Sequence, residues 1–277
     1  MKTHKHRFPV GFYFGLILLG AIIILIAGAS FFMPYDPLAD NPADRLQGIS
    51  AEHIFGTDRF GRDVFTRVLY GGRITIISCV TALFSAMAIG LIIGLFTGMH
   101  SGSVVDSIMM RIIDVLMSFP FMVLAMVVAA LFGASLATLL FVVVAVWWVP
   151  FARMTRSLVM RAKSETYISA AEILGAKNST IMFRELLPQV LGQVLIQATF
   201  ELGSLILTIA ALSFLGMGSQ PPAPEWGSML NDGRDHFMQT PYILLGPSLF
   251  IILTVLSLNL IGEGVRDRLD PYEIVEL

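Results

Sequence analysis

Six apolar runs divide the sequence, and each holds about 20 residues, the number needed to cross the ~30 Å hydrocarbon core of a bilayer as an α-helix. They occupy residues 12–33, 74–99, 108–132, 136–152, 189–215 and 242–261. A soluble domain cannot bury so much apolar surface, and the composition agrees, because 56% of the 277 residues are hydrophobic and 14% are charged. The sequence therefore predicts an all-α integral membrane protein with six transmembrane helices.

The polar segments between the runs define the expected organisation. The run at 12–33 is expected to be a retained first span, since it is longer than the core of a signal peptide and no small-residue cleavage site follows it. The expected parts are a cytoplasmic N-terminus at 1–11, an extracytoplasmic loop at 34–73, a membrane core at 74–262 and a cytoplasmic tail at 263–277. Within the core lie a cytoplasmic loop at 153–188 and an outer loop at 216–241, whose many Pro and Gly residues predict a folded-back segment.

Basic residues decide the expected orientation. The loop at 153–188 alone carries six Lys and Arg residues, and with both termini inside, the cytoplasmic segments hold 12 of the 18 basic residues. Lys and Arg concentrate on the cytoplasmic side of membrane proteins. The opposite orientation would place the most basic loop outside, so we expect both termini in the cytoplasm.

The loop at 34–73 contains the sequence GTDRFGRD at 56–63, followed by VFTRVLYGGR. Phe60, Val64 and Val68 recur at helical spacing, and Thr57 and Asp58 are residue types that cap helices. We expect a short helix in the membrane interface here, ahead of the second span.

Glycine and proline mark two features of the spans. Gly90, Gly94 and Gly98 share one helical face, which predicts close packing against another helix, because small residues let membrane helices approach each other. Pro120 is expected to kink the third span.

Four larger side chains near span ends indicate interfacial roles. Arg111 and Asp114 lie near the start of the third span, where they can pair with each other or reach the interface. Trp147 and Trp148 lie near the far end of the fourth span, where tryptophan commonly anchors a helix in the interface; lining of a transport path is the alternative.

Within the loop at 153–188, the sequence predicts two short helices separated by a glycine. The first is expected at 167–174 with Gly175 as its C-cap, and the second extends to Leu187 with Ser179 as its N-cap. The apolar face of the resulting knob would consist of Ile168, Ala171, Ile173 and Leu174.

This loop resembles the cytoplasmic coupling motif of permease subunits in ABC importers, whose pattern is Glu-Ala-Ala, three residues, Gly, nine residues, then Ile-x-Leu-Pro. The residues that match at the required spacing are Ala170, Ala171, Gly175, Leu187 and Pro188. Ser169 stands where the family has glutamate and Glu185 where it has isoleucine, while Glu172 supplies an acid nearby.

Three other stretches narrow the resemblance: GTDRFGRD, LSFLGMGSQPPAPEWG and NLIGEGVRDRLDP. They are similar to the second permease subunit of the peptide/nickel branch, and the resemblance covers about residues 34–271. It implies the type I importer permease fold in a bacterial cytoplasmic (inner) membrane. The implied partners are a homologous second permease, two ATPase subunits and an extracytoplasmic solute-binding protein, with no nucleic acid.

The resemblance also assigns roles to residues. An ATPase-coupling role is implied for Ser169, Ala170, Ala171, Glu172, Gly175, Leu187 and Pro188. ATP and Mg would bind to the ATPase subunits, because this chain has no GxxxxGKS or GxxxxGKT sequence. We therefore expect no catalytic residue and no cofactor in this chain.

The fifth span carries a polar stripe: Gln189, Gln193, Gln197 and Glu201 recur every four residues, and Ser204 and Thr208 continue the line. Polar groups are costly in hydrocarbon unless they face protein or water. The residues expected to line the translocation path are Gln193, Gln197, Glu201, Ser204 and Thr208. Bonding to the second permease across the dimer seam is the alternative.

Glu201 is the only ionisable residue well inside this span, and it would favour a cationic cargo. It resembles the acid of nickel-type members, and ARMTRSLV at 152–159 does likewise. A single carboxylate without nearby His or Cys makes at most a transient metal site. Nickel, free or chelated, is the first cargo expected, and di- or oligopeptides are the alternative. His4 and His6 are expected to be solvated and Cys79 buried.

Two other classes of protein agree less well with the sequence. An intramembrane enzyme would need a nucleophile–base pair or a cluster of metal ligands within the spans, and the sequence contains neither. An ion-coupled secondary transporter, with Glu201 as a proton site, usually carries internal repeats, and the six spans are unlike one another.

Overall fold

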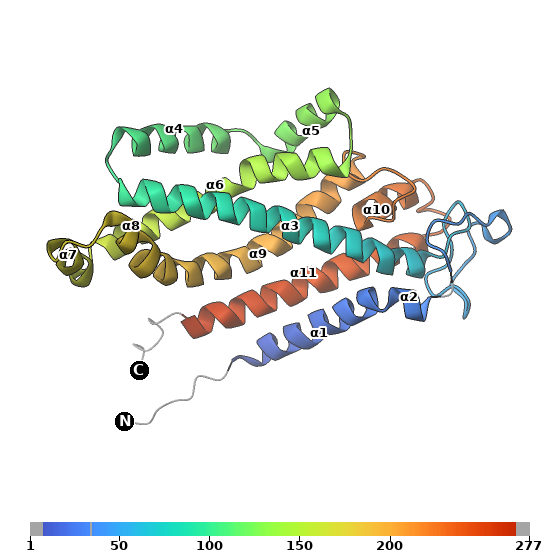
Figure 1. Cartoon of the computed structure of the whole chain (residues 1–277). Coiled ribbons are helices and arrows are strands. Elements are labelled where there is room, and N and C mark those ends of the chain that lie inside the picture. The colour runs from blue at the N-terminus through green and yellow to red at the C-terminus, as the bar shows by residue number, and fades with distance from the viewer. Residues whose placement is uncertain (1–7, 34, 270–277) are drawn as a thin grey trace. The chain divides into compact units, whose positions relative to one another are not determined.

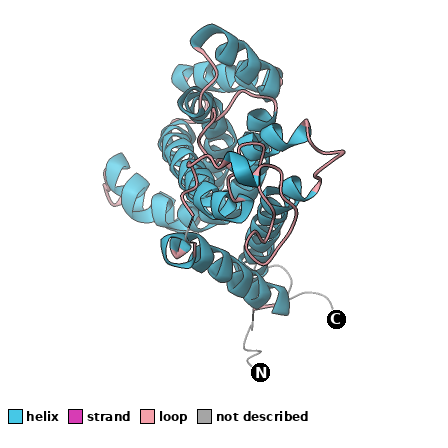
Figure 2. Ribbon diagram, turned by 90° about the vertical axis from the view of Figure 1, so that its right-hand side faces the viewer, coloured by secondary structure: helices cyan, strands magenta, loops and turns pink. Residues whose placement is uncertain are grey.

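The computed structural model describes residues 8–33 and 35–269, which form helices and loops without a β-strand (Figure 2). The elements are α1 (Val10–Ala27), α2 (Ala29–Phe32), the 3-10 turn η1 (Pro42–Asp44), α3 (Val64–Met99), α4 (Val104–Ser118), α5 (Phe121–Phe132), α6 (Leu136–Lys163), α7 (Thr166–Ile173), α8 (Asn178–Thr180), the π-helical turn η2 (Ile181–Leu186), α9 (Leu187–Phe214), α10 (Trp226–Arg234) and α11 (Tyr242–Leu269) (Figure 1). The all-α prediction is confirmed.

Five described helical stretches are long and apolar enough to cross a membrane: α1, α3, α6, the stretch Asn178–Phe214 and α11. The pair α4 and α5 makes a sixth if it is one broken span, since the two helices are bent by 84° at their junction. Pro120 lies in that junction, so the predicted kink is a complete break. Most helices run past the predicted spans, because helix-forming polar residues continue them beyond the apolar run.

The chain divides into two compact units. The first contains the described residues within 1–80, 129–139 and 199–277, and the second contains 81–128 and 140–198. The helices α3, α5, α6 and α9 contribute to both units.

In the first unit, α1 lies along α11 (Figure 1). Gly15 allows this approach, because a Cβ at its position would lie 2.9 Å from the Ser257 carbonyl oxygen and 3.0 Å from Leu260 Cβ. The C-terminal end of α1 is held by Arg73 of α3, whose Nε donates to the Ile26 carbonyl at 2.9 Å.

The segment between α9 and α11 folds back onto the first unit, as its Pro- and Gly-rich sequence predicts. Its centre is Trp226, which is fully buried and donates from Nε1 to the Val68 carbonyl of α3 at 2.8 Å. Gly71 is required beside it, because a Cβ there would collide with the Pro224 carbonyl.

The carboxylate of Glu225 caps the start of α10. Its two oxygens accept hydrogen bonds from the backbone N–H groups of Gly227 and Ser228, each at 2.9 Å. Both N–H groups lack an intrahelical acceptor, so the buried carboxylate satisfies them. The EWG sequence at 225–227 is thus a structural joint.

The prediction of a short interfacial helix after Gly56 is wrong. The residues from Val64 onward are the beginning of α3, which is one continuous helix of 36 residues. Asp63 caps it, since Asp63 Oδ2 accepts from Thr66 N at 2.7 Å and from Thr66 Oγ1 at 2.6 Å. Thr57 and Asp58 therefore cap no helix, and residues 56–63 form a turn.

In the second unit, the glycine stripe of α3 packs against α6, which confirms the prediction. A Cβ at Gly90 would lie 2.5 Å from the Trp148 carbonyl oxygen, and one at Gly94 would lie 2.5 Å from Thr155 Cβ. A Cβ at Gly98 would lie 2.7 Å from Val159 Cβ. The two backbones are in close contact over about two turns.

The structure shows what the side chains of Trp147 and Trp148 pack against within the second unit. Trp148 is buried in an apolar cluster with Ile113, and Trp147 packs against that cluster and lies edge-on to Phe121, with ring centroids 5.0 Å apart. Both residues lie near the middle of α6, which continues past the predicted span to Lys163.

The charged side chains of the second unit join different helices. Asp114 pairs with Arg153 of α6 at 2.6 Å, and not with Arg111 as the sequence suggested. Arg156 binds Asp106 through two hydrogen bonds of 2.6 and 2.8 Å. These contacts fasten α4 to the polar end of α6.

We predict that Gly94→Ala lowers the thermal unfolding temperature of the purified protein in detergent. The added Cβ would force α3 and α6 apart, and overpacking of this kind costs about 1–3 kcal/mol. The matched control is Gly20→Ala in α1, where a Cβ would have no neighbour within 4 Å. Alanine favours helix over glycine, so the control should keep or raise stability; equal losses in both variants would contradict the packing assignment.

Candidate functional site

The helix α7 occupies the place of the first predicted helix of the knob and ends as predicted at a glycine. Gly175 has φ +82°, and the N–H of Ala176 donates to the Ala171 carbonyl at 3.0 Å. This six-residue closure is a Schellman motif, which binds the carbonyls left over at the helix end. Only glycine adopts the required φ without strain.

The second predicted helix differs from the prediction. It begins at Asn178, so Ser179 lies inside it, and it passes through η2 into α9 without a gap. Leu187 and Pro188 are thus the first residues of α9. Proline has no N–H to donate and its ring clashes with the carbonyl four residues earlier, which the wider π-helical turn before it relieves.

The predicted apolar face of the knob is divided between two sides of α7. Ile168 is 0% exposed, whereas Ile173 and Leu174 are 86% and 87% exposed. Helical residues five apart differ by about 140° in direction, so Ile168 and Ile173 cannot share a face. Ser169 and Ala170 are exposed, Ala171 is half-buried, and the side chain of Glu172 lies outside the described part of the chain.

The polar stripe of α9 lies away from the buried face of the helix. Gln189, Gln193 and Ser204 are exposed, and Gln197, Glu201 and Thr208 are half-buried. The buried face consists of Val190, Val194, Ala198, Leu205, Ile206 and Ile209. The stripe is therefore open to water, lipid or a second protein along part of its length.

A hydrogen bond that the sequence did not predict joins α7 to this stripe. Tyr167 Oη donates to Gln189 Oε1 at 2.8 Å. Tyr167 lies in the first turn of α7, and Gln189 is the first residue of the stripe. Nothing in the spacing of two residues 22 positions apart indicates this contact.

A buried ionic cluster occupies the first unit, where the sequence predicted the interfacial helix. Arg62 Nε donates to Asp58 Oδ2 at 2.8 Å, and Arg67 Nε lies 3.5 Å from the same oxygen. Arg67 is only 2% exposed and also donates to the Pro37 carbonyl at 2.8 Å. The alternating Asp and Arg residues of 58–67 were the available signal for this cluster.

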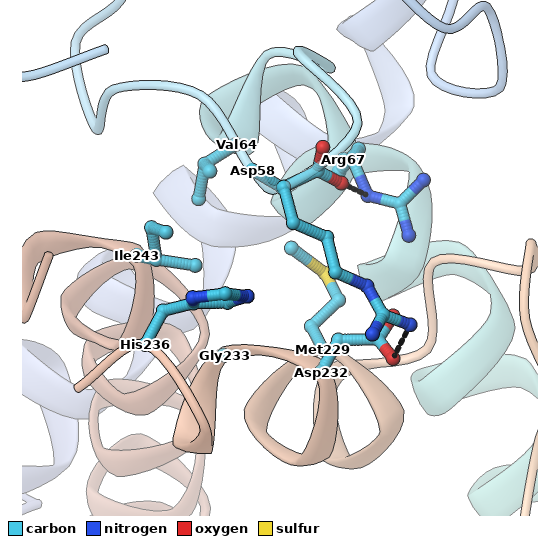
Figure 3. Close-up of a pocket in the computed structure, with 9 residues that line it drawn as sticks. Asp58, Val64, Arg67, Met229, Asp232, Gly233, His236 and Ile243 are labelled. Carbon is cyan, nitrogen blue, oxygen red and sulfur yellow. Dashed lines mark hydrogen bonds and ion pairs between the residues drawn. The ribbon is translucent and has the colours of Figure 1, made fainter. Parts of the chain in front are cut away.

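A small cavity of about 10 Å³ lies beside this cluster. Figure 3 shows the residues that line it, from the turn at 56–63 and α10 among others. Asp58, Arg67, Asp232 and His236 line it, and Arg59 is paired with Asp232 at 3.4 Å. The volume suits about one water molecule. Burial raises the pKa of Asp232, and the Arg59 guanidinium acts in the opposite direction.

The described residues contain no group of three or more His, Cys, Asp and Glu side chains that could hold a metal ion. His53 is bound to Asp63 at 2.9 Å, and Cys79 is buried as expected. His4 and His6 lie outside the described residues.

Comparison with known protein families now identifies the architecture. The family model described as "binding-protein-dependent transport system inner membrane component" matches residues 90–273. The chain belongs to this family. It is a permease of an ABC importer of the peptide/nickel family, with the type I importer permease fold.

Individual relatives cover almost the whole permease. It is 41% identical to the dipeptide transport system permease protein DppC of Alkalihalophilus pseudofirmus, over 93% of this chain and 84% of the relative. It is 42% identical to the glutathione transport system permease protein GsiD of Pectobacterium atrosepticum, over 93% of this chain and 85% of the relative. The GsiD protein of Escherichia coli O157:H7 is also 42% identical, over 90% and 82%.

We predict that Asp232→Asn changes the pH dependence of stability. Because burial raises its pKa, the folded permease binds more protons than the unfolded chain above the ordinary carboxyl pKa of about 4. The stability that this group contributes therefore falls as pH rises from about 4 through the raised pKa of Asp232. The Asp232→Asn variant should not show this decrease. Unfolding temperatures measured between pH 4 and 7 test it, with exposed Asp235→Asn as the control for loss of one charge; identical slopes in Asp232→Asn and the unchanged permease would contradict it.

Proposed function

We propose that the permease is one of two homologous membrane subunits of an ATP-driven importer of short peptides in the bacterial inner membrane. It would receive cargo from an extracytoplasmic solute-binding protein and pass it inward by alternating access, with both termini in the cytoplasm. The names of the relatives, which are dipeptide and glutathione permeases, support a peptide cargo. The basic loop at 153–188 supports the orientation.

The observation that carries the coupling role is the exposed end of α7. Ile173 and Leu174 are two adjacent large apolar side chains that are almost fully exposed. In a loop that we propose to lie in the cytoplasm because of its basic residues, they have no lipid to cover them, and such exposed apolar residues mark protein contacts. The contact we propose is a groove of an ATPase subunit. ATP and Mg are held by two such subunits, and this chain contributes no catalytic residue.

The stripe on α9 is proposed to line the translocation path. Peptides offer N–H and C=O groups, and the amides of Gln193 and Gln197 can both donate and accept hydrogen bonds. Ser204 and Thr208 extend this polar surface, and Glu201 can accept the terminal ammonium of a peptide. Contact with the second permease remains compatible, because a path between two permeases would run along their seam.

Nickel, the first cargo expected from the sequence, gains no support. The expectation depended on Glu201 as a transient metal contact, and one carboxylate gives little selectivity for a metal. The same carboxylate serves a cationic peptide end equally well. Peptides are therefore the better proposal.

We predict that Leu174→Asp leaves the permease in the membrane but lowers ATP-driven peptide uptake at least tenfold. A charge buried in an apolar docking site loses its hydration without compensation. A single apolar anchor residue contributes about 2 kcal/mol or more to binding. Uptake and co-purification of the ATPase subunits are measured together. Lys177→Ser, an exposed change in the same loop, is the control, and normal ATPase binding by Leu174→Asp would show the docking assignment to be wrong.

We predict that Glu201→Gln selectively weakens uptake of peptides with a free amino terminus. Loss of one charge-assisted hydrogen bond corresponds to about 1.5–3 kcal/mol, or roughly ten- to hundredfold in affinity. Competition between a dipeptide and its N-acetylated form, in proteoliposomes with all partner subunits, measures the preference. If the variant retains the same preference as the unchanged permease, Glu201 does not contact the cargo.

A further inference from the structure

The helix α7 lies against η2, the π-helical turn that leads into α9. Both elements contain fully buried apolar residues: Ile168 in α7, and Ile181 and Leu186 in η2. Buried side chains are close-packed, so α7 cannot tilt far from η2 without opening a cavity. This packing opposes separation of the two elements.

The hydrogen bond between Tyr167 and Gln189 adds a directional constraint. Apolar packing is non-directional and allows one element to turn on the other, whereas a hydrogen bond of 2.8 Å requires a defined orientation. Gln189 lies two residues into α9, on the same face as the polar stripe. The rotation of the stripe about the axis of α9 is thereby related to the position of α7.

Gly175 alone would suggest the opposite behaviour. A glycine at φ +82° just after a helix is a natural place for a hinge, at which α7 could swing independently of α9. However, the packing of α7 on η2 and the Tyr167–Gln189 bond both bridge this position in space. These contacts involve the beginning of α7, at Tyr167, whereas the exposed residues Ile173 and Leu174 lie at its C-terminal end. They oppose bending at Gly175.

We propose that α7, η2 and the first turn of α9 move as one rigid piece, in which Tyr167 and Gln189 are positioning residues. A displacement of the exposed end of α7 then turns the beginning of the polar stripe with it. This inference depends on the proposed function, in which an ATPase subunit displaces α7. It adds that the stripe is moved directly, without a flexible joint.

A cross-link tests rigidity. In a Cys79→Ala background, which removes the single cysteine of the sequence, Tyr167→Cys and Gln189→Cys are joined by a short bismaleimide within the assembled importer, whose other subunits carry no reactive cysteine. The unlinked pair should transport more slowly than the background protein, since the hydrogen bond is lost. Linking should restore uptake. A linked complex that hydrolyses ATP but transports less than the unlinked one would show that α7 must move against α9, which overturns the proposal.

A mutant cycle tests the hydrogen bond itself. Tyr167→Phe and Gln189→Leu should each lower the peptide taken up per ATP hydrolysed by about two- to tenfold, the range of one ordinary hydrogen bond. The double variant should be no worse than either single one. Gln189→Glu should retain coupling, because a carboxylate still accepts from the tyrosine. Tyr13→Phe, an exposed tyrosine of α1, is the matched control.

The possible results separate this inference from the proposed function. Additive losses, or loss in Gln189→Glu equal to that in Gln189→Leu, would overturn the positioning role. If Tyr167→Phe releases the ATPase subunits, the residue belongs to the docking surface and the inference is also overturned, while the proposed function stands. Uptake that continues without the ATPase subunits would instead refute the proposed function.

Discussion

Helix ends are the constraint on which this structure depends. A helix leaves N–H groups unpaired at its start and carbonyls unpaired at its end, and a bilayer supplies little water to bind them. Here Asp63 and Glu225 bind the starts of α3 and α10, while Arg73 and Lys163 bind the last carbonyls of α1 and α3. Each charge has the sign that the helix dipole favours at that end. Asp63 and Glu225 each cap their own helix, whereas Arg73 of α3 and Lys163 of α6 also fasten one helix to another.

The helices and their close contacts could be predicted, because each depends on a local pattern. Apolar runs of sufficient length gave the spans, and the four-residue spacing of Gly90, Gly94 and Gly98 gave a contact that the packing against α6 confirms. The ends of the helices could not be predicted from hydropathy. The apolar run ends where the lipid is expected to end, but the residues after Ala152 are good helix formers and α6 continues to Lys163.

Contacts between residues far apart in the sequence could not be predicted either. The partner of Asp114 is Arg153, and the position of Trp148 in an apolar cluster follows from the full length of α6. The candidate site could be proposed from the sequence as a set of residues, because the stretch that resembles the coupling motif is contiguous. Its geometry was not: the division of the apolar residues of α7 into a buried Ile168 and an exposed Ile173 follows from which face meets η2. The Tyr167–Gln189 bond depends on the same docking.

The π-helical turn before Pro188 has a consequence for how this loop can vary in length. A π-helical turn holds one residue more than the α-helical turn it replaces, so it behaves as a single-residue insertion absorbed by the helix. Deleting one residue from Ile181–Leu186 would restore α-helical winding and leave the residues before it in nearly the same orientation relative to α9, because the π-helical turn has already absorbed the extra residue. A further insertion that the helix did not absorb would instead rotate everything before it by about 100° relative to α9. The exposed end of α7 would then point in another direction, although every residue type remained in place. This segment should therefore tolerate the loss of one residue better than the gain of one.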